Sequence, residues 1–307
     1  MDKRILEIAE RIHKLNVWEK AAKNQFAIEL KGEAAPYFVI ADPVYEHPML
    51  RAHILFLEGW QGFQTYSLWR QDKSYGFITT PMELLGIEVL WLKKGGLMVM
   101  RNRPGCQPII NDPVYVKKTE KLLWQVYGLF LRLEENENLS MKYVNDGSML
   151  AMREVTAKRF EEVALKVLPI IPHKESVSYP VAMAKKAKDL GVKDGETWVV
   201  SFGPNIDCVT RDELHRFAYQ LTIDRKEDKV NLLTASCSVN PPTITLRDLY
   251  ESYPPRVLRA IIELGYMPGE IEVHNKRDFR LLRSLTLELP FKLHLITPPT
   301  GKNPATE

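Results

Sequence analysis

The chain has 307 residues, which is more than one hydrophobic core usually serves, so its length predicts two domains. Hydrophobic residues make up 45% and charged residues 26% of the sequence, as in an ordinary soluble globular protein. The formal net charge is +3, which is too small to indicate a nucleic-acid-binding protein by electrostatics alone.

The sequence also argues against a membrane, a zinc centre and a disulfide framework. No apolar run approaches the roughly 20 residues that a membrane-spanning helix needs. The N-terminal segment MDKRILEIAERIHKL is charged and amphipathic and has no cleavable apolar region, so we expect a cytoplasmic protein with no membrane partner. Cys106, Cys208 and Cys237 lie too far apart for a zinc-type pair, and an odd, sparse set does not form a disulfide framework.

Hydrophobic spacing in the first half of the chain predicts helices that alternate with short strands. Apolar residues recur at helical intervals in four segments: 3–23, 60–71, 114–137 and 160–167. Strand-like runs occupy residues 25–30, 36–41, 52–58 and 86–94, separated by Gly and Pro.

The clearest domain boundary follows the last of these helices. Residues 169–180, PIIPHKESVSYP, contain three prolines in a short polar stretch. The prediction is therefore an N-terminal α+β domain over residues 1–168 and a C-terminal domain over 180–297. Residues 298–307 are expected to form a flexible tail.

The second half predicts a mixed sheet flanked by helices. A helix at 180–190 precedes a buried-looking strand at 196–202, and a hairpin is expected from strands 217–223 and 229–236. A helix over 246–264, kinked or split at Pro254 and Pro255, should end at Gly265. Strand 270–274, a helix that buries Phe279, Leu282 and Leu285, and strand 292–297 complete the domain.

The start of the hairpin has a second interpretation. Leu214, Phe217, Ala218 and Leu221 also fit one face of a helix, and Thr210 with Glu213 has the spacing of a capping box. We favour a short helical turn that leads into the hairpin.

This element order, three strands followed by helix, strand, helix and strand, resembles the ribonuclease H-like fold over residues 196–297. Enzymes of that fold place carboxylates near the ends of the first and fourth strands, where they hold divalent metal ions for phosphoryl transfer. The corresponding positions here hold Ser201 and the pair His274 and Asn275. Asp207 is expected beyond the first strand and Asp224 at the head of a turn, so the sequence predicts no metal, no cofactor and no catalytic residue.

The segment EIEVHNKRDFRLL, residues 270–282, carries the most specific candidate site. It reads as a strand followed by a helix, with Asn275 as the N-cap and Lys276 and Arg277 in the first turn, where positive charge is unfavourable. One interpretation is an anion site, in which Asn275, Lys276, Arg277 and Arg280 converge on a phosphate or an acidic partner.

The other interpretation is a solvated helix face. Lys276, Arg280 and Arg283 share one face, and these cations could pair with nearby carboxylates such as Glu272, Asp278 or Glu288. Under the first interpretation the partner is an acidic protein or a nucleic acid.

Other motifs give weaker indications. The seven histidines show no metal-ligand spacing, and neither a phosphate-binding glycine motif nor a nucleophile elbow occurs. Trp60, Phe63, Tyr66 and Trp69 form an aromatic stripe at helical spacing, which could be a binding platform but is more typical of a helix that packs its own core.

Four segments resemble an uncharacterised bacterial two-domain protein family of unknown function: residues 24–63, 103–108, 119–133 and 254–296. The resemblance implies a two-domain protein but assigns no catalytic residue. The chain departs from it at Met267 and Pro268, where Arg-Pro is more frequent, and at His274 and Asn275, where an acidic residue is frequent. The function expected is a non-catalytic binding or scaffold protein; the alternative is a phosphate- or nucleic-acid-binding protein, including a divergent nuclease-like enzyme.

Overall fold

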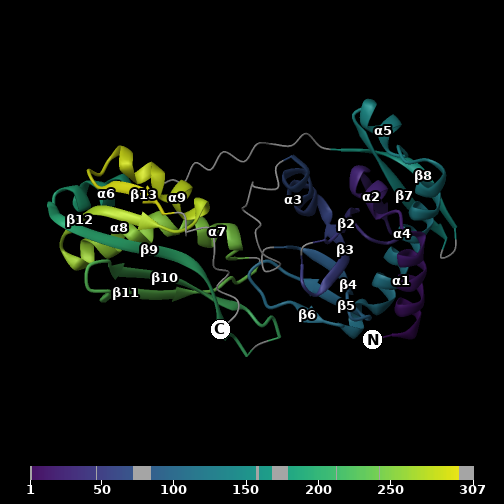
Figure 1. Ribbon diagram of the computed structural model, residues 1–307. Coiled ribbons are helices and arrows are strands. Elements are labelled where there is room, and N and C mark those ends of the chain that lie inside the picture. The colour runs from purple at the N-terminus through teal and green to yellow at the C-terminus, as the bar shows by residue number, and fades with distance from the viewer. Residues whose placement is uncertain are drawn as a thin grey trace. The chain divides into compact units, whose positions relative to one another are not determined.

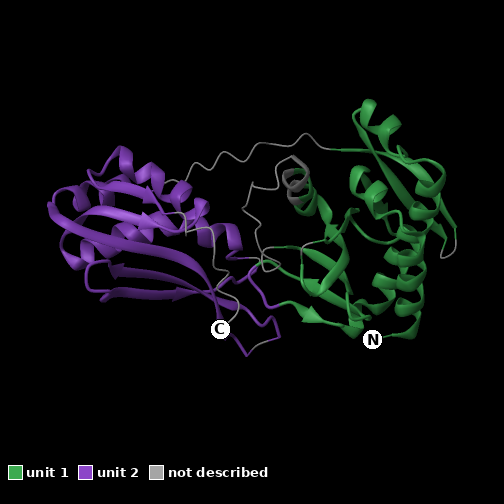
Figure 2. Ribbon diagram, in the orientation of Figure 1, with its two compact units in different colours: residues 1–104, 108–171 green, residues 105–107, 172–307 purple. Residues whose placement is uncertain are grey.

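A computed structural model describes residues 2–45, 47–71, 84–156, 159–167, 179–211, 213–241 and 243–296. The chain divides into two compact units, one of residues 1–104 and 108–171 and the other of residues 105–107 and 172–307 (Figure 2). Each contains a β-sheet with helices, so the α+β class is confirmed. Most of the predicted linker, and the predicted tail at 298–307, lie outside the described residues.

Unit 1 is built on an eight-stranded sheet with the order β6-β5-β4-β3-β2-β1-β7-β8 (Figure 1). Neighbouring strands run antiparallel, except that β1 and β7 are parallel. The strands are β1 (Phe26–Glu29), β2 (Tyr37–Pro43), β3 (Leu50–Glu58), β4 (Gly86–Leu92), β5 (Leu97–Asn102), β6 (Ile109–Ile110), β7 (Ser148–Thr156) and β8 (Arg159–Lys166).

Helices cover both faces of this sheet. Those of unit 1 are α1 (Lys3–Leu15), α2 (Trp18–Lys23), α3 (Gly59–Gln71), η2 (Pro113–Tyr115), α4 (Val116–Glu135) and α5 (Met141–Asn145). One face packs residues such as Val39 and Phe56 against α1, α2 and α4, and the other packs Phe38 and Leu57 against α3. Adjacent strand residues face opposite sides of the sheet, and helices cover both sides. Central strands such as β2 are therefore apolar along most of their length.

Two helix predictions in unit 1 are wrong. The single helix expected over residues 3–23 is two helices, because Asn16 adopts a left-handed conformation (φ 53°) that ends α1. The helix expected over 160–167 is the edge strand β8, which pairs with β7. Phe160 packs on one face of the sheet and Val163 on the other, so the strand lacks the alternation that would have identified it.

The aromatic stripe of α3 belongs to the core. Phe63 and Tyr66 are buried, and their rings lie 4.7 Å and 6.0 Å from that of Phe38. Trp60 packs against the same cluster, whereas the side chain of Trp69 lies outside the described residues. The core interpretation of the stripe is therefore confirmed for its first three members.

Unit 2 is built on a five-stranded sheet with the order β11-β10-β9-β12-β13. The strands are β9 (Val192–Val209), β10 (Phe217–Arg225), β11 (Asn231–Cys237), β12 (Met267–Val273) and β13 (Lys292–Leu295). β10 is antiparallel to β9 and β11, and β12 is parallel to both β9 and β13. The predicted order of strands and helices is confirmed, although a turn at Glu213 and Leu214, and not a helix, precedes β10.

The helices of unit 2 are α6 (Val181–Lys188), α7 (Leu246–Glu251), α8 (Tyr253–Leu264), α9 (Lys276–Arg283) and η3 (Ser284–Leu287). The predicted interruption near the two prolines is confirmed, because α7 ends at Glu251 and α8 begins at Tyr253. Alternate residues of β9 are buried on the helical face, where the ring of Phe202 stacks 5.1 Å from that of Tyr253. The intervening residues, such as Ser201 and Gly203, are half-buried and form a polar face.

None of the described helices combines the length and the apolar character that crossing a bilayer requires.

Candidate functional site

One hollow of unit 2 lies where β9 continues past the end of β12. Pairing between these strands extends to Glu272, opposite Val199, and β9 then runs on to Val209. The hollow has a volume of about 480 Å³. It is lined by Ser201, Phe202, Gly203, Pro204 and Asn205 of β9, Gln220 and Thr222 of β10, and Asn275 and Arg277 at the start of α9.

The sheet register brings hydroxyl and amide groups together on this surface. Ser201 lies opposite Thr222, and Gly203 lies opposite Gln220, so all four residues face the same way. The Ser201 Oγ and Thr222 Oγ1 atoms are 2.7 Å apart and share a hydrogen bond. Hydroxyls and amides both donate and accept, so this lining suits a polar ligand that does the same.

A buried carboxylate supports the hollow from below. Asp278 is fully buried, and its Oδ2 atom accepts hydrogen bonds from the backbone N–H of Phe202 (3.2 Å) and from Asn275 Nδ2 (2.8 Å). The bond from Phe202 satisfies a backbone N–H of β9 beyond the point where its pairing with β12 ends. Burial raises the pKa of Asp278 to about 6, although the neighbouring Arg277 guanidinium and these hydrogen bonds act in the opposite direction.

Arg277 is held in one orientation by an aromatic residue and by Asp278. Its guanidinium donates a hydrogen bond to the hydroxyl of Tyr250 (2.7 Å) and lies 4.4 Å from the centre of the Tyr250 ring. The Nε atom is 3.9 Å from Asp278 Oδ1. This arrangement explains how a cation is tolerated in the first turn of α9, because the adjacent carboxylate offsets the positive potential of the helix start.

The structure brings two of the four predicted anion-binding residues to the hollow. Asn275 and Arg277 line it, whereas Lys276 is exposed, Arg280 is half-buried, and neither is among its lining residues. The predicted N-cap is confirmed, since the Asn275 side chain accepts a hydrogen bond from the Asp278 N–H (2.7 Å). That these residues bind an anion stays a prediction.

The carboxylates of this unit have other partners. Glu272, one of three carboxylates that could pair with α9 under the solvated-face interpretation, accepts a hydrogen bond from Lys226 (2.5 Å). Asp224 accepts one from Asn231 (2.8 Å). Asp207 is exposed and lies within β9, so the prediction that it follows the strand is wrong; the strand is longer than its apolar run.

The described lining of the hollow contains no Asp or Glu. Within the described ranges, no cluster of three or more His, Cys, Asp or Glu side chains has an arrangement that could hold a metal ion.

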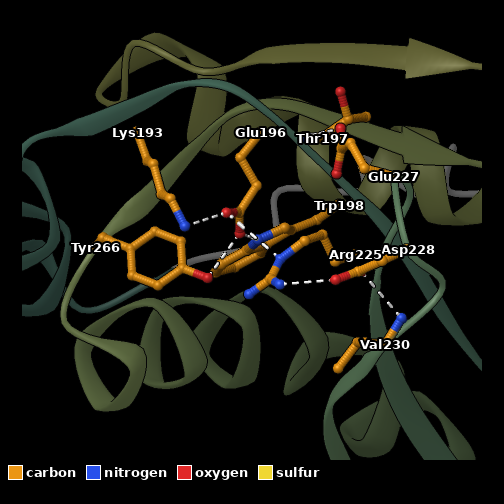
Figure 3. A network of polar contacts seen from close by, with 9 residues as sticks. All are labelled: Lys193, Glu196, Thr197, Trp198, Arg225, Glu227, Asp228, Val230 and Tyr266. Atoms are coloured by element: carbon orange, nitrogen blue, oxygen red, sulfur yellow. Dashed lines mark hydrogen bonds and ion pairs between the residues drawn. The ribbon is translucent and has the colours of Figure 1, made fainter.

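A second polar network braces the other end of the same sheet and was missed in the sequence (Figure 3). Glu196 is buried and accepts hydrogen bonds from Trp198 Nε1 (2.8 Å) and the Tyr266 hydroxyl (2.6 Å). Lys193 and Arg225 form ion pairs with the same carboxylate, at 2.6 Å and 3.5 Å. Burial alone would raise the pKa of Glu196, but these donors outweigh it and lower the pKa to about 2. All these groups point toward one another, which indicates a structural role.

Unit 1 contains a partly buried polar cluster that the sequence also failed to indicate. His53 of β3 lies between Asp42 of β2 (Nε2 to Oδ2, 3.9 Å) and Glu88 of β4 (Nδ1 to Oε1, 3.4 Å). Burial acts to lower the pKa of His53, but the two carboxylates outweigh it and raise the pKa to about 9. Neighbouring strands bring together residues that are far apart in the sequence, so no local motif marks the cluster.

Comparisons of the chain with known protein families, with curated proteins and with solved structures found no match. Membership of the bacterial two-domain family therefore stays a prediction.

Proposed function

We propose that this protein is a non-catalytic binding protein and that the hollow of unit 2 is its ligand site. The observation that carries the proposal is the lining, which combines paired hydroxyls, amide side chains and the oriented Arg277, and which contains no carboxylate among its described residues. Such a surface can bind a polar ligand but offers no base or metal ligand for hydrolysis. A cytoplasmic location belongs to the same proposal.

The proposal includes a degenerate ribonuclease H-like module in unit 2. It is supported by the strand order β11-β10-β9-β12-β13, in which β10 alone runs opposite to the other four strands. The helices that connect β11 to β12 and β12 to β13 support it as well. Metal-dependent enzymes of that fold carry an acid at the end of the fourth strand, and the hollow lies beside the end of β12, the fourth strand of unit 2.

Metal binding tests the absence of catalysis. The full-length protein would be crystallised and soaked with Mn²⁺, and a parallel titration would follow the free Mn²⁺ signal by electron paramagnetic resonance. We expect no ordered metal ion in unit 2 and no loss of the free signal. A Mn²⁺ ion held by two or more side chains of this unit would overturn the non-catalytic proposal.

A second candidate, phosphate or nucleic-acid recognition, is favoured by one specific observation. Arg277 presents a pre-oriented guanidinium beside the N-terminus of an eight-residue helix, a position where exposed N–H groups and the helix dipole attract anions. Lys276, exposed on the same turn, would add a further phosphate contact.

Binding of inorganic phosphate and of labelled single- and double-stranded oligonucleotides would be measured over a series of salt concentrations. Phosphate contacts make log K fall linearly with log salt. We expect Arg277→Gln to weaken oligonucleotide binding by about tenfold, the value of one charge-assisted contact. Arg283→Gln, at the exposed far end of α9, is the charge-matched control and should behave as wild type. Undetectable binding at low salt, or equal losses in both variants, would remove this candidate.

A further inference from the structure

The outer face of α4 carries a repeat whose residues lie outside the hydrophobic core of unit 1. Six of its residues are spaced alternately by four and three positions, as in the seam of a coiled coil: Lys117, Lys121, Trp124, Gly128, Leu131 and Glu135. We call these residues the α4 seam. The opposite face of the helix, including Leu122, Val126 and Leu133, is buried against the sheet.

The α4 seam is open to solvent at its centre. Trp124 and Leu131, two turns apart on this face, are each 39% exposed. Between them, a Cβ atom added at Gly128 would meet nothing within 4 Å, so the helix backbone is accessible there. Arg11 lies 5.7 Å above the Trp124 ring, and Tyr127 contacts the same ring edge-on at 5.7 Å, so the indole is supported but not covered.

We propose that the α4 seam is a self-association surface, on which a second copy of this chain docks its own α4 in the antiparallel direction. Antiparallel coiled coils pair the two types of seam position across the interface. The layers are then Lys117 with Glu135 of the second copy, Trp124 with Gly128 of the second copy, and Leu131 with Lys121 of the second copy. Each layer occurs twice, because a two-fold axis makes the interface self-complementary.

Shape and charge both favour this direction. The largest side chain of the α4 seam meets the residue without a side chain, which lets the two helices approach closely. Lys117 and Glu135 have no ion pair within the part of the chain that the structure describes, so both are available to each other across the interface. A parallel arrangement would instead place Trp124 against Trp124 and like charges against each other.

Lys121 fits the remaining layer through its aliphatic stem. Its ammonium group is held by the buried carboxylate of Glu154, with Nζ–O distances of 2.8 Å and 3.2 Å, on the side of the sheet. The methylene groups of Lys121 are therefore left to cover Leu131 of the second copy.

Charge reversal gives a test that does not depend on disrupting the fold, because Lys117 and Glu135 are exposed. Sedimentation equilibrium of the full-length chain would measure the mass from low to high micromolar concentrations. We expect wild type to shift from the monomer mass of 35.4 kDa toward twice that value. Lys117→Glu and Glu135→Lys should each remain monomeric, because each variant places like charges in both outer layers.

An equimolar mixture of the two variants should recover the doubled mass, since every outer layer then pairs opposite charges, and so should the double variant. Lys94→Glu, an exposed change in the turn after β4, is the matched control and should associate like wild type. Gly128→Ala should weaken association, because its methyl group would occupy the space that receives Trp124 of the second copy. Alanine favours helix more than glycine does, so weaker association of this variant would not come from unfolding of α4. A monomeric wild type, or single variants that still associate, would overturn the proposal, and failure of the mixture to recover would overturn the antiparallel arrangement.

Discussion

Replacing Asp278 by asparagine should change how the stability of unit 2 depends on pH. The pKa of Asp278 is about 6 in the folded chain and 3.8 for the free side chain. Folding therefore favours the protonated form, and the stabilisation this provides is complete below pH 3.8 and lost as the pH rises through 6. A difference of about two pKa units corresponds to roughly 3 kcal/mol. Asp278→Asn keeps an oxygen for Phe202 and Asn275 but never acquires the charge.

The measurement is hydrogen exchange of peptides from β9 and α9, made on wild type and variant at matched pH so that intrinsic exchange rates cancel. Relative to wild type, the local opening free energy of Asp278→Asn should increase by up to roughly 3 kcal/mol between pH 4 and pH 7.5. Any loss of stability that the asparagine amide itself causes does not depend on pH, so it shifts the difference in opening free energy equally at every pH. Asp207→Asn, at an exposed position of β9, is the control and should track wild type. A constant difference between Asp278→Asn and wild type across this range would refute the reasoning.

Three further predictions concern the two polar networks and one glycine. Glu196→Gln should lower the unfolding free energy of unit 2 by roughly 2–3 kcal/mol in urea titrations, because charge-assisted hydrogen bonds to a buried carboxylate are lost; an unchanged midpoint would contradict this. His53 should stabilise unit 1 fully below pH 6.5 and lose that effect as the pH rises through about 9, and His53→Gln should remove this pH dependence of the unfolding midpoint. In thermal unfolding scans, Gly86→Ala should destabilise unit 1 by about 3 kcal/mol or more, because the new Cβ would lie 1.9 Å from the Phe56 carbonyl oxygen. Gly95→Ala, with nothing within 4 Å of its new Cβ, should cost only about 1 kcal/mol in the same scans, and equal losses in the two variants would contradict the prediction.

The elements that sequence patterns predicted well are those whose local signals agree with their tertiary environment. The α8 helix has a strong apolar face and ends at Gly265, whose φ of 78° suits glycine, so both its course and its end were predictable. The α4 helix was predictable for the same reason, with one face that is apolar along its whole length.

The elements that were missed depend on distant partners. The strand β7 was not predicted, because its apolar run is only four residues long (149–152) and charged residues follow it. The strand β8 was taken for a helix, because it is an edge strand with apolar groups on both faces. Both segments are strands because they pair with each other and because β7 also pairs with β1. No local sequence pattern contains these pairings.

The candidate site was predictable only in part for a related reason. Asn275 was recognisable as an N-cap from its immediate neighbours. Tyr250 and Phe202, which fix Arg277 and Asp278, come from other elements, and the opposition of Ser201 and Thr222 follows from the register of β9 and β10. The alternation of small polar residues along those strands was the one local signal that could have pointed to the hollow.

The parallel pairing of β1 with β7 has a consequence for biosynthesis. Because Phe26 pairs with Leu150, the first strand to leave the ribosome keeps one hydrogen-bonding edge unpaired until almost all of unit 1 has been made. Closing so long a loop is slow, and an open strand edge invites contacts with other chains in the meantime. The five consecutive antiparallel strands β1 to β5 can assemble early, and the β7–β8 hairpin then completes the sheet from the other side.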